Sequence, residues 1–101
     1  MLSGGCGGLG KSLADLILTR GGHVYLCDVA DVTADIEKHR SKHQGKKVDG
    51  CELDVRSKDS WESAMKSCVD TLGTPDILVN IAGVKGEQDW ENLYDINLVG
   101  I

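Results

Sequence analysis

Short apolar runs alternate with segments of helical periodicity along the whole chain. The apolar runs predict strands at residues 23–28, 48–53 and 77–81, and the periodic segments predict helices at 9–20, 32–43, 61–72 and from 88 onward. The most regular helical stripe begins at Trp61 and runs through Met65 and Cys68 to Leu72, a spacing that places apolar side chains on one helix face. Strands that alternate with helices predict an α/β fold with a doubly wound parallel sheet.

The two ends of the sequence lead to a further expectation about this sheet. Only Met1 and Leu2 remain at the place where this topology has its first strand, which lies between the second and fourth strands. We therefore expect a truncated domain, with its first strand mostly missing and its C-terminal half absent. In such a domain the strands at 23–28 and 77–81 would present unpaired edges toward a gap.

A glycine-rich segment near the N-terminus carries candidate phosphate chemistry and fits two general patterns. Gly5-x-Gly7-x-x-Gly10 is the dinucleotide fingerprint, in which glycines permit a tight turn and let a pyrophosphate approach a helix N-terminus. Gly5-x-x-x-x-Gly10-Lys11-Ser12 is also a Walker A sequence, with Lys11 available for the β- and γ-phosphates and Ser12 for Mg²⁺. The segment alone is compatible with both.

The end of the next strand favours the dinucleotide. Asp28 follows Gly10 by 18 residues, where a carboxylate accepts hydrogen bonds from the ribose hydroxyls and repels a 2′-phosphate. Val29 and Ala30 follow it rather than Lys or Arg, which favours NAD over NADP. Residues 1–101 are therefore predicted to form a partial NAD-binding, Rossmann-like domain. A P-loop nucleoside-triphosphate-binding protein is the alternative, but it leaves the polar residues at the two later strand ends unexplained.

Four segments resemble the short-chain dehydrogenase/reductase family, and the resemblance covers the whole chain. They are Gly4-x-x-x-Gly8-x-Gly10 after Ser3, Asp54-Val55, Asn80-Ile81-Ala82-Gly83, and Ile96-Asn97-Leu98. In that family the first of these segments holds the pyrophosphate and the second holds the adenine ring. The third supports the sheet beside the cofactor, and the fourth supplies a catalytic asparagine. The resemblance implies one catalytic residue, Asn97, and a set of cofactor-binding residues: Ser3, Gly4, Gly8, Leu9, Gly10, Asp28, Asp54, Val55, Asn80, Ala82 and Gly83.

Within the family, residues 76–84, Trp90-Glu91 and residues 96–99 resemble the NAD-dependent 15-hydroxyprostaglandin dehydrogenase branch. This implies oxidation of a secondary alcohol, such as a prostaglandin-like lipid, by hydride transfer to NAD. The chain departs from the family at Ile81, which stands where the family has a second asparagine.

The larger departure concerns the catalytic Ser and the Tyr-x-x-x-Lys pair, because neither Tyr25 nor Tyr94 is followed four residues later by Lys. Acid–base catalysis on an alcohol needs such a hydroxyl group, so we expect this chain to be inactive by itself. A non-catalytic truncated product that pairs with full-length subunits is a further alternative.

Composition excludes several other classes of function. A net charge of −5 disfavours a nucleic-acid partner, and no apolar run approaches the roughly 20 residues that cross a bilayer. The N-terminus shows no secretory signal, and the four cysteines are too scattered to bind metal or form a redox pair, so we expect a cytoplasmic protein with reduced thiols. The expected partners are a small-molecule substrate in the full-length protein and further copies of the same chain.

His39 and His43 lie one helical turn apart in the second predicted helix. Lys38, Arg40 and Lys42 surround them in the sequence, which is typical of a solvated helix face. Two imidazoles without a third ligand make a poor metal site, so we expect no metal there.

Overall fold

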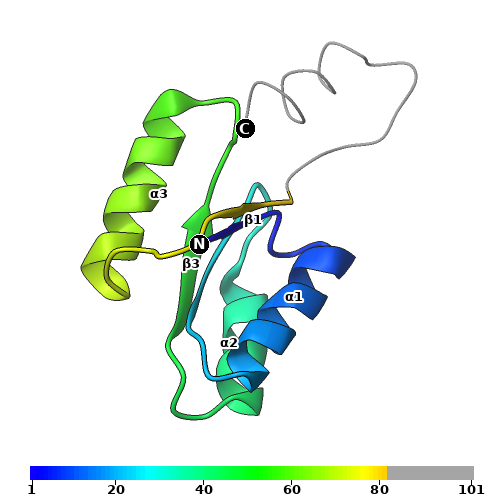
Figure 1. The fold of residues 1–101 in the computed structure, drawn as a ribbon. Coiled ribbons are helices and arrows are strands. Elements are labelled where there is room, and N and C mark those ends of the chain that lie inside the picture. Colours follow the sequence, from blue (N-terminus) through cyan, green and yellow to red (C-terminus); the bar gives the residue numbers. More distant parts are fainter. Residues whose placement is uncertain (82–101) are drawn as a thin grey trace.

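The computed structural model describes residues 1–81 and contains four strands and three helices in that range (Figure 1). The strands are β1 (Leu2–Ser3), β2 (Val24–Asp28), β3 (Val48–Glu52) and β4 (Val79–Asn80), and the helices are α1 (Gly8–Thr19), α2 (Thr33–Lys42) and α3 (Lys58–Thr71). The helix predicted from residue 88 onward lies outside the described residues. None of these three helices is long and apolar enough to cross a membrane.

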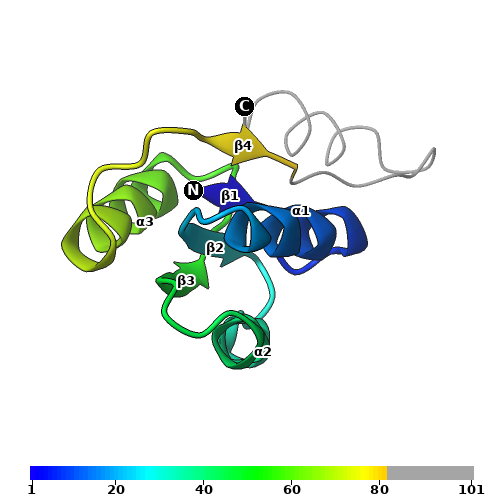
Figure 2. The same ribbon diagram turned by 60° about the horizontal axis from the view of Figure 1, so that its bottom comes forward.

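The strands form one parallel sheet in the order β3-β2-β1-β4 (Figure 2). This order, with helices on both faces, confirms the predicted doubly wound, Rossmann-like fold. The strand β2 pairs with β3 over five residues, from Val24 opposite Val48 to Asp28 opposite Glu52. It forms the longest ladder in the described sheet.

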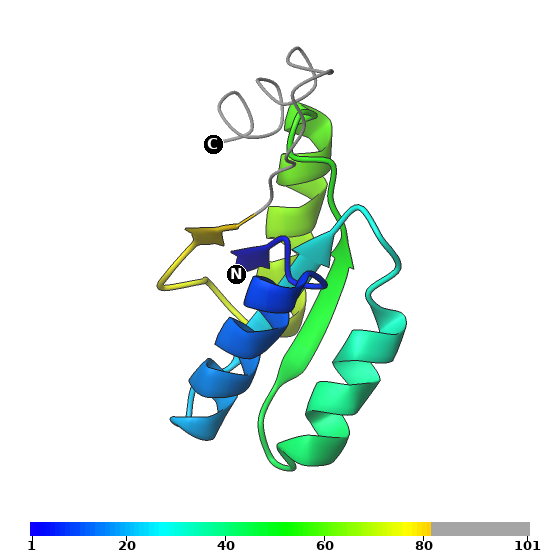
Figure 3. The same ribbon diagram turned by 90° about the vertical axis from the view of Figure 1, so that its right-hand side faces the viewer.

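The strand β1 occupies the centre of the sheet although it has only two residues (Figure 3). Leu2 pairs with Leu26 on one side and with Val79 on the other. The ladder extends beyond the strand, because the N–H of Gly5 donates to the carbonyl of Cys27 at 3.0 Å. The expected gap with unpaired edges is therefore wrong: two extended residues are enough to present donors and acceptors to both neighbours.

The strand β4 is shorter than the predicted run at 77–81. It pairs with β1 alone among the described strands, so the two residues of β1 limit its length. Ile77 and Leu78 precede it and are 70% and 50% exposed.

Alternation of side chains along β2 divides the core into two clusters. Val24 and Leu26 face the side covered by α1 and α2, and Tyr25 and Cys27 face the side covered by α3, as successive residues of a strand must. All four are at most 2% exposed. A strand that is apolar on both faces is what the continuous run in the sequence predicted.

The helix α2 does not present both histidines to solvent. His39 is 8% exposed, and the Nε2 atom of His43 lies 2.6 Å from Oδ1 of Asp15 in α1. The expectation of a solvated face is therefore wrong for His39, because α2 turns this side toward the rest of the fold.

The side-chain bond between Ser3 and Asn80 supports the central strand, and its removal provides a test. The Ser3 hydroxyl donates to Oδ1 of Asn80 across the β1–β4 pair. We expect Ser3→Ala to lower the free energy of unfolding by about 1 kcal/mol or more, because the amide oxygen loses its partner. Urea denaturation measures this, with Ser12→Ala on the exposed side of α1 as the matched control, expected to change stability by less than about 0.5 kcal/mol. Equal stability of the two variants would contradict this role of the bond.

Candidate functional site

A cavity of about 290 Å³ lies at the carboxyl ends of the strands, where ligands bind in open parallel sheets. It is lined by the glycine loop and by the residues that follow β2, β3 and β4. These residues are Ser3, Gly4, Gly7, Gly8, Leu9, Gly10, Cys27, Asp28, Val29, Leu53, Asp54, Val55, Arg56 and Ile81. The fold thus brings together eight of the predicted cofactor-binding residues that lie up to 52 positions apart in the sequence.

The glycine loop carries the chain from β1 into α1 by a turn that other residues would obstruct. Gly4 has a φ of 71°, a conformation that L side chains rarely adopt. A Cβ atom on Gly10 would lie 2.2 Å from the carbonyl oxygen of Gly4, whereas a Cβ on Gly8 would meet nothing within 4 Å. The loop is therefore closed against α1 at Gly10 and open at Gly8, which leaves room for a ligand beside the backbone.

The start of α1 is suited to an anion. Its N-cap is Gly7, and no side chain caps the helix there. The first N–H groups of an α-helix have no intrahelical acceptor, and the helix dipole places partial positive charge at this end. The residues present thus fit the pyrophosphate of a dinucleotide, which would lie against the backbone at Gly8.

Asp28 is held at the end of β2 by backbone donors. Its Oδ2 accepts from the N–H of Cys6 at 3.0 Å and its Oδ1 accepts from the N–H of Ala30 at 3.1 Å. An ionised carboxylate has about four acceptor positions, so each oxygen keeps capacity for a ligand hydroxyl. The bond to Cys6 also ties this carboxylate to the glycine loop.

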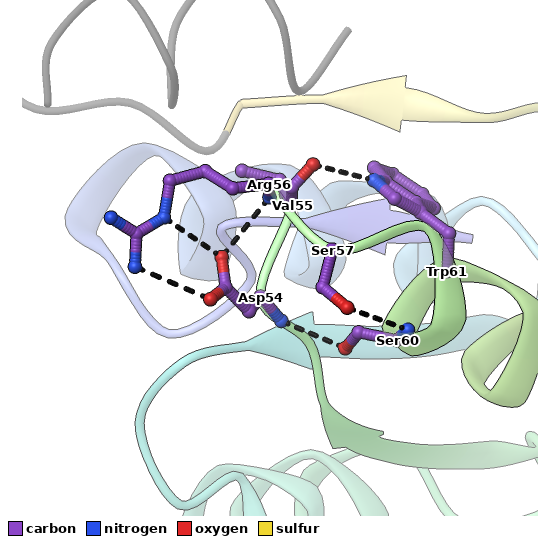
Figure 4. A network of polar contacts seen from close by, with 6 residues as sticks. All are labelled: Asp54, Val55, Arg56, Ser57, Ser60 and Trp61. Carbon is purple, nitrogen blue, oxygen red and sulfur yellow. Dashed lines mark hydrogen bonds and ion pairs between the residues drawn. The ribbon is translucent and has the colours of Figure 1, made fainter. Parts of the chain in front are cut away.

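Asp54 lies in a polar turn between β3 and α3 (Figure 4). Its Oδ1 accepts from the N–H and the Nε–H of Arg56 at 3.0 and 3.1 Å, and its Oδ2 lies 3.3 Å from Nη2. These bonds, first the guanidinium and then the backbone N–H, hold the pKa of Asp54 below its ordinary value. The cavity wall here is therefore an ion pair rather than a lone acid.

The same turn is fixed from the α3 side. The Asp54 N–H donates to the Ser60 hydroxyl at 3.0 Å, and the Trp61 indole N–H donates to the Val55 carbonyl at 2.9 Å (Figure 4). Ser57 caps α3 by accepting from the Ser60 N–H at 3.2 Å. Val55 is only 6% exposed, so its backbone is held firmly at the rim of the cavity.

The structure separates the predicted site residues into three groups. Eight of them line the cavity. Asn80 is not among the lining residues and instead accepts a hydrogen bond from Ser3, which supports the sheet. Ala82, Gly83 and Asn97 lie outside the described residues.

Lys11 is not directed at the cavity as a Walker A lysine would be. Its Nζ lies 3.5 Å from Oδ1 of Asp35 in α2, and neither Lys11 nor Ser12 is among the described lining residues. A dinucleotide site and a nucleoside-triphosphate site would both use the glycine loop. Only the dinucleotide interpretation also uses the residues at the later strand ends that line the cavity.

Sequence reasoning missed five lining residues, Cys27, Val29, Leu53, Arg56 and Ile81, whereas Gly7 was named in the dinucleotide fingerprint. Arg56 had a local signal, because a cation two positions after an aspartate can reach its carboxylate and the backbone N–H can close an Asx turn. The other residues border the cavity only through the packing of neighbouring strand ends.

Comparison with known families agrees with this geometry. The family described as short chain dehydrogenase matches residues 1–101. The chain belongs to the short-chain dehydrogenase family. This confirms the predicted resemblance, and members of the family use nicotinamide cofactors.

Proteins that are similar to this chain in sequence or in fold differ in the substrates and cofactors that their names state. The chain is 31% identical to 3beta-hydroxysteroid dehydrogenase 2 of Eggerthella lenta over 97% of its own length and 41% of that protein. It is 31% identical to 15-hydroxyprostaglandin dehydrogenase [NAD(+)] of Macaca fascicularis over 100% of its own length and 39% of that protein. L-sorbose reductase from Gluconobacter frateurii, complexed with NADPH and L-sorbose, has the same fold, with a TM-score of 0.84 and 20% identity over 98% of this chain and 41% of that chain. The chain therefore spans about two fifths of the length of these relatives.

The Asp54–Arg56 pair can be tested by titration. We expect Arg56→Gln to raise the pKa of Asp54, because the variant loses the guanidinium and keeps only the backbone N–H. A lowered pKa stabilises the fold above the ordinary carboxyl pKa, and that stabilisation disappears as the pH falls through the lowered value. NMR titration of the side-chain carboxyl carbon measures the shift, with Arg40→Gln in α2 as the control. An unchanged pKa in Arg56→Gln would show that the guanidinium does not act on this carboxyl group.

Proposed function

We propose that this chain forms the NAD-binding part of a short-chain dehydrogenase that oxidises a secondary alcohol. The observation that carries the proposal is the position of Asp28, at the end of β2, on the wall of the cavity and beside the open backbone at Gly8. A carboxylate there accepts hydrogen bonds from both ribose hydroxyls and repels the additional phosphate of NADP.

The charges around the cavity support NAD. Val29 and Ala30 follow Asp28 and carry no charge. Arg56 lines the cavity, but its guanidinium is paired with Asp54 on the same wall. The residues beside Asp28 therefore offer no cation for a 2′-phosphate, whose two negative charges would face a carboxylate.

Each part of the chain has a distinct task in this proposal. The start of α1 and the backbone at Gly8 bind the pyrophosphate, Asp28 selects the ribose, and the turn at Asp54 and Val55 holds the adenine ring. When bound, NAD supplies the hydride acceptor for the alcohol. The 101 residues contain no Tyr-x-x-x-Lys pair, so we expect them to bind the cofactor without turning over an alcohol.

The substrate of the whole protein is proposed only as a class. The names of two relatives specify hydroxysteroid and hydroxyprostaglandin dehydrogenases, and both name a hydroxyl group on a lipid-like skeleton. A hydroxylated lipid, including a prostaglandin-like one, is therefore the substrate class we propose. Four free cysteines among the described residues are consistent with the proposed cytoplasmic location. We also propose that the full-length protein associates with further copies of itself.

Binding of nucleotides to two single-site variants tests this function. We expect Asp28→Ala to weaken NAD binding by about tenfold or more, equivalent to about 1.4 kcal/mol, and to reduce the preference for NAD over NADP. Lys11→Met is the matched control and should bind NAD as the wild type does, because Lys11 pairs with Asp35. Isothermal titration calorimetry measures the affinity of the wild type and of each variant for NAD, for NADP and for ATP with Mg²⁺.

Two results would overturn the proposal. If Asp28→Ala bound NAD with wild-type affinity, the Asp28 carboxylate would not be part of the NAD-binding site. Tight binding of ATP with Mg²⁺ that is lost in Lys11→Met would assign the loop to a nucleoside-triphosphate-binding protein instead.

A further inference from the structure

A second cluster of polar side chains lies between α1 and α2. It consists of Asp15 from α1, His39 from α2 and His43, the C-cap residue that follows α2. None of the three lines the cofactor cavity. Whatever this cluster does is therefore independent of the proposed dinucleotide site.

The two histidines are arranged as metal ligands on a helix are. They are four residues apart, His39 in the last turn of α2 and His43 at its C-cap, and their ring centroids are 6.5 Å apart with 28° between the planes. Pairs at this spacing bind zinc in known helical metal sites. The missing element in the sequence was a third ligand, and α1 supplies it.

The ligand atoms of the three side chains are close enough to share one ion. One atom from each residue lies within 4.8 Å of the other two, and Nε2 of His43 is already 2.6 Å from Oδ1 of Asp15. Two ligand atoms of one tetrahedral Zn²⁺ lie about 3.4 Å apart. The longest separation, which is at most 4.8 Å, must therefore shorten by up to about 1.4 Å, which side-chain rotation can provide.

The ligand types in this cluster suit a transition-metal ion. His39 is buried, with 8% of its surface exposed, and its ligand atom lies within 4.8 Å of those of Asp15 and His43. Imidazole nitrogens and carboxylate oxygens are common ligands of Zn²⁺.

Lys42 is the competitor for this position. Its Nζ lies 2.9 Å from Oδ1 of Asp15, but its side chain is 65% exposed, so it can move into solvent when an ion binds. The side chain of Asp15 is 36% exposed, which leaves one side of the cluster open to water as a further ligand.

We propose that Asp15, His39 and His43 form a binding site for a divalent transition-metal ion such as Zn²⁺, which clamps α1 to α2. Imidazole and carboxylate ligands suit zinc and its neighbours in the first transition row. Because the ligands come from α1 and from the C-terminal end of α2, which the chain connects through β2, an ion here would restrain the α1–α2 pair. It would stabilise the fold without taking part in hydride transfer.

Zinc binding by the full 101-residue chain tests this site. After treatment with a chelator, we expect one equivalent of Zn²⁺ to bind in calorimetry and to raise the thermal unfolding midpoint. His43→Gln and Asp15→Asn should each weaken binding by about tenfold or more. His23→Gln, which removes the one histidine outside the cluster, is the matched control and should behave as the wild type.

Lys42→Gln separates the metal site from a purely structural network. A network of Asp15 with Lys42 and His43 would lose a contact in this variant and gain nothing from zinc. The metal site would instead bind Zn²⁺ at least as tightly as the wild type does, because a competing cation is gone. Weaker binding in Lys42→Gln would count against the proposal.

Histidine NMR signals of the wild type keep the test decisive if a variant fails to fold. Zinc should shift the imidazole signals of His39 and His43 and leave those of His23 in place. Absence of zinc binding by the wild type, or shifts confined to His23 or to cysteine signals, would overturn the site. Binding of NAD is measured separately and does not depend on this result.

Discussion

Main-chain pairing of two residues, Leu2 and Ser3, connects the two halves of the described sheet. Their N–H and C=O groups pair with β2 on one side and with β4 on the other, so the strand ends that line the cavity are held side by side in one sheet. Buried peptide groups without partners cost free energy, and a short central strand removes that cost for both neighbours. The hydrogen bond between Ser3 and Asn80 adds a side-chain link between β1 and β4.

The cavity is a consequence of this sheet rather than of any one motif. The carboxyl ends of parallel strands meet at one edge, so Asp28 and Asp54 reach the same cavity as the glycine loop although they lie far apart in sequence. Backbone groups then help to set their positions, because the Cys6 N–H donates to Asp28 and the Arg56 N–H donates to Asp54. In the proposed function, the ribose hydroxyls bind the Asp28 carboxylate and the anionic pyrophosphate lies at the start of α1.

The two sides of α2 illustrate how a sequence pattern can mislead. Its basic residues indicate a solvated face, and Arg40 and Lys42 are indeed exposed. His39 lies among them in the sequence but turns toward α1 and is buried. The lysine of the Walker-like sequence is another case, because Lys11 pairs with Asp35 of this helix instead of reaching the loop it belongs to.

The sequence by itself determined the order of strands and helices, the family, and the residue types at the strand ends. These are local properties: the apolar run ending at Asp28 and the glycines at positions 4, 8 and 10 can be read without knowing their neighbours. Only the tertiary structure decided that two residues complete the centre of the sheet, that Arg56 joins the cavity wall, and that Asp15 meets His39 and His43. Each of these depends on contacts between segments whose relative positions are set by packing, and no periodicity or spacing along the chain records such contacts.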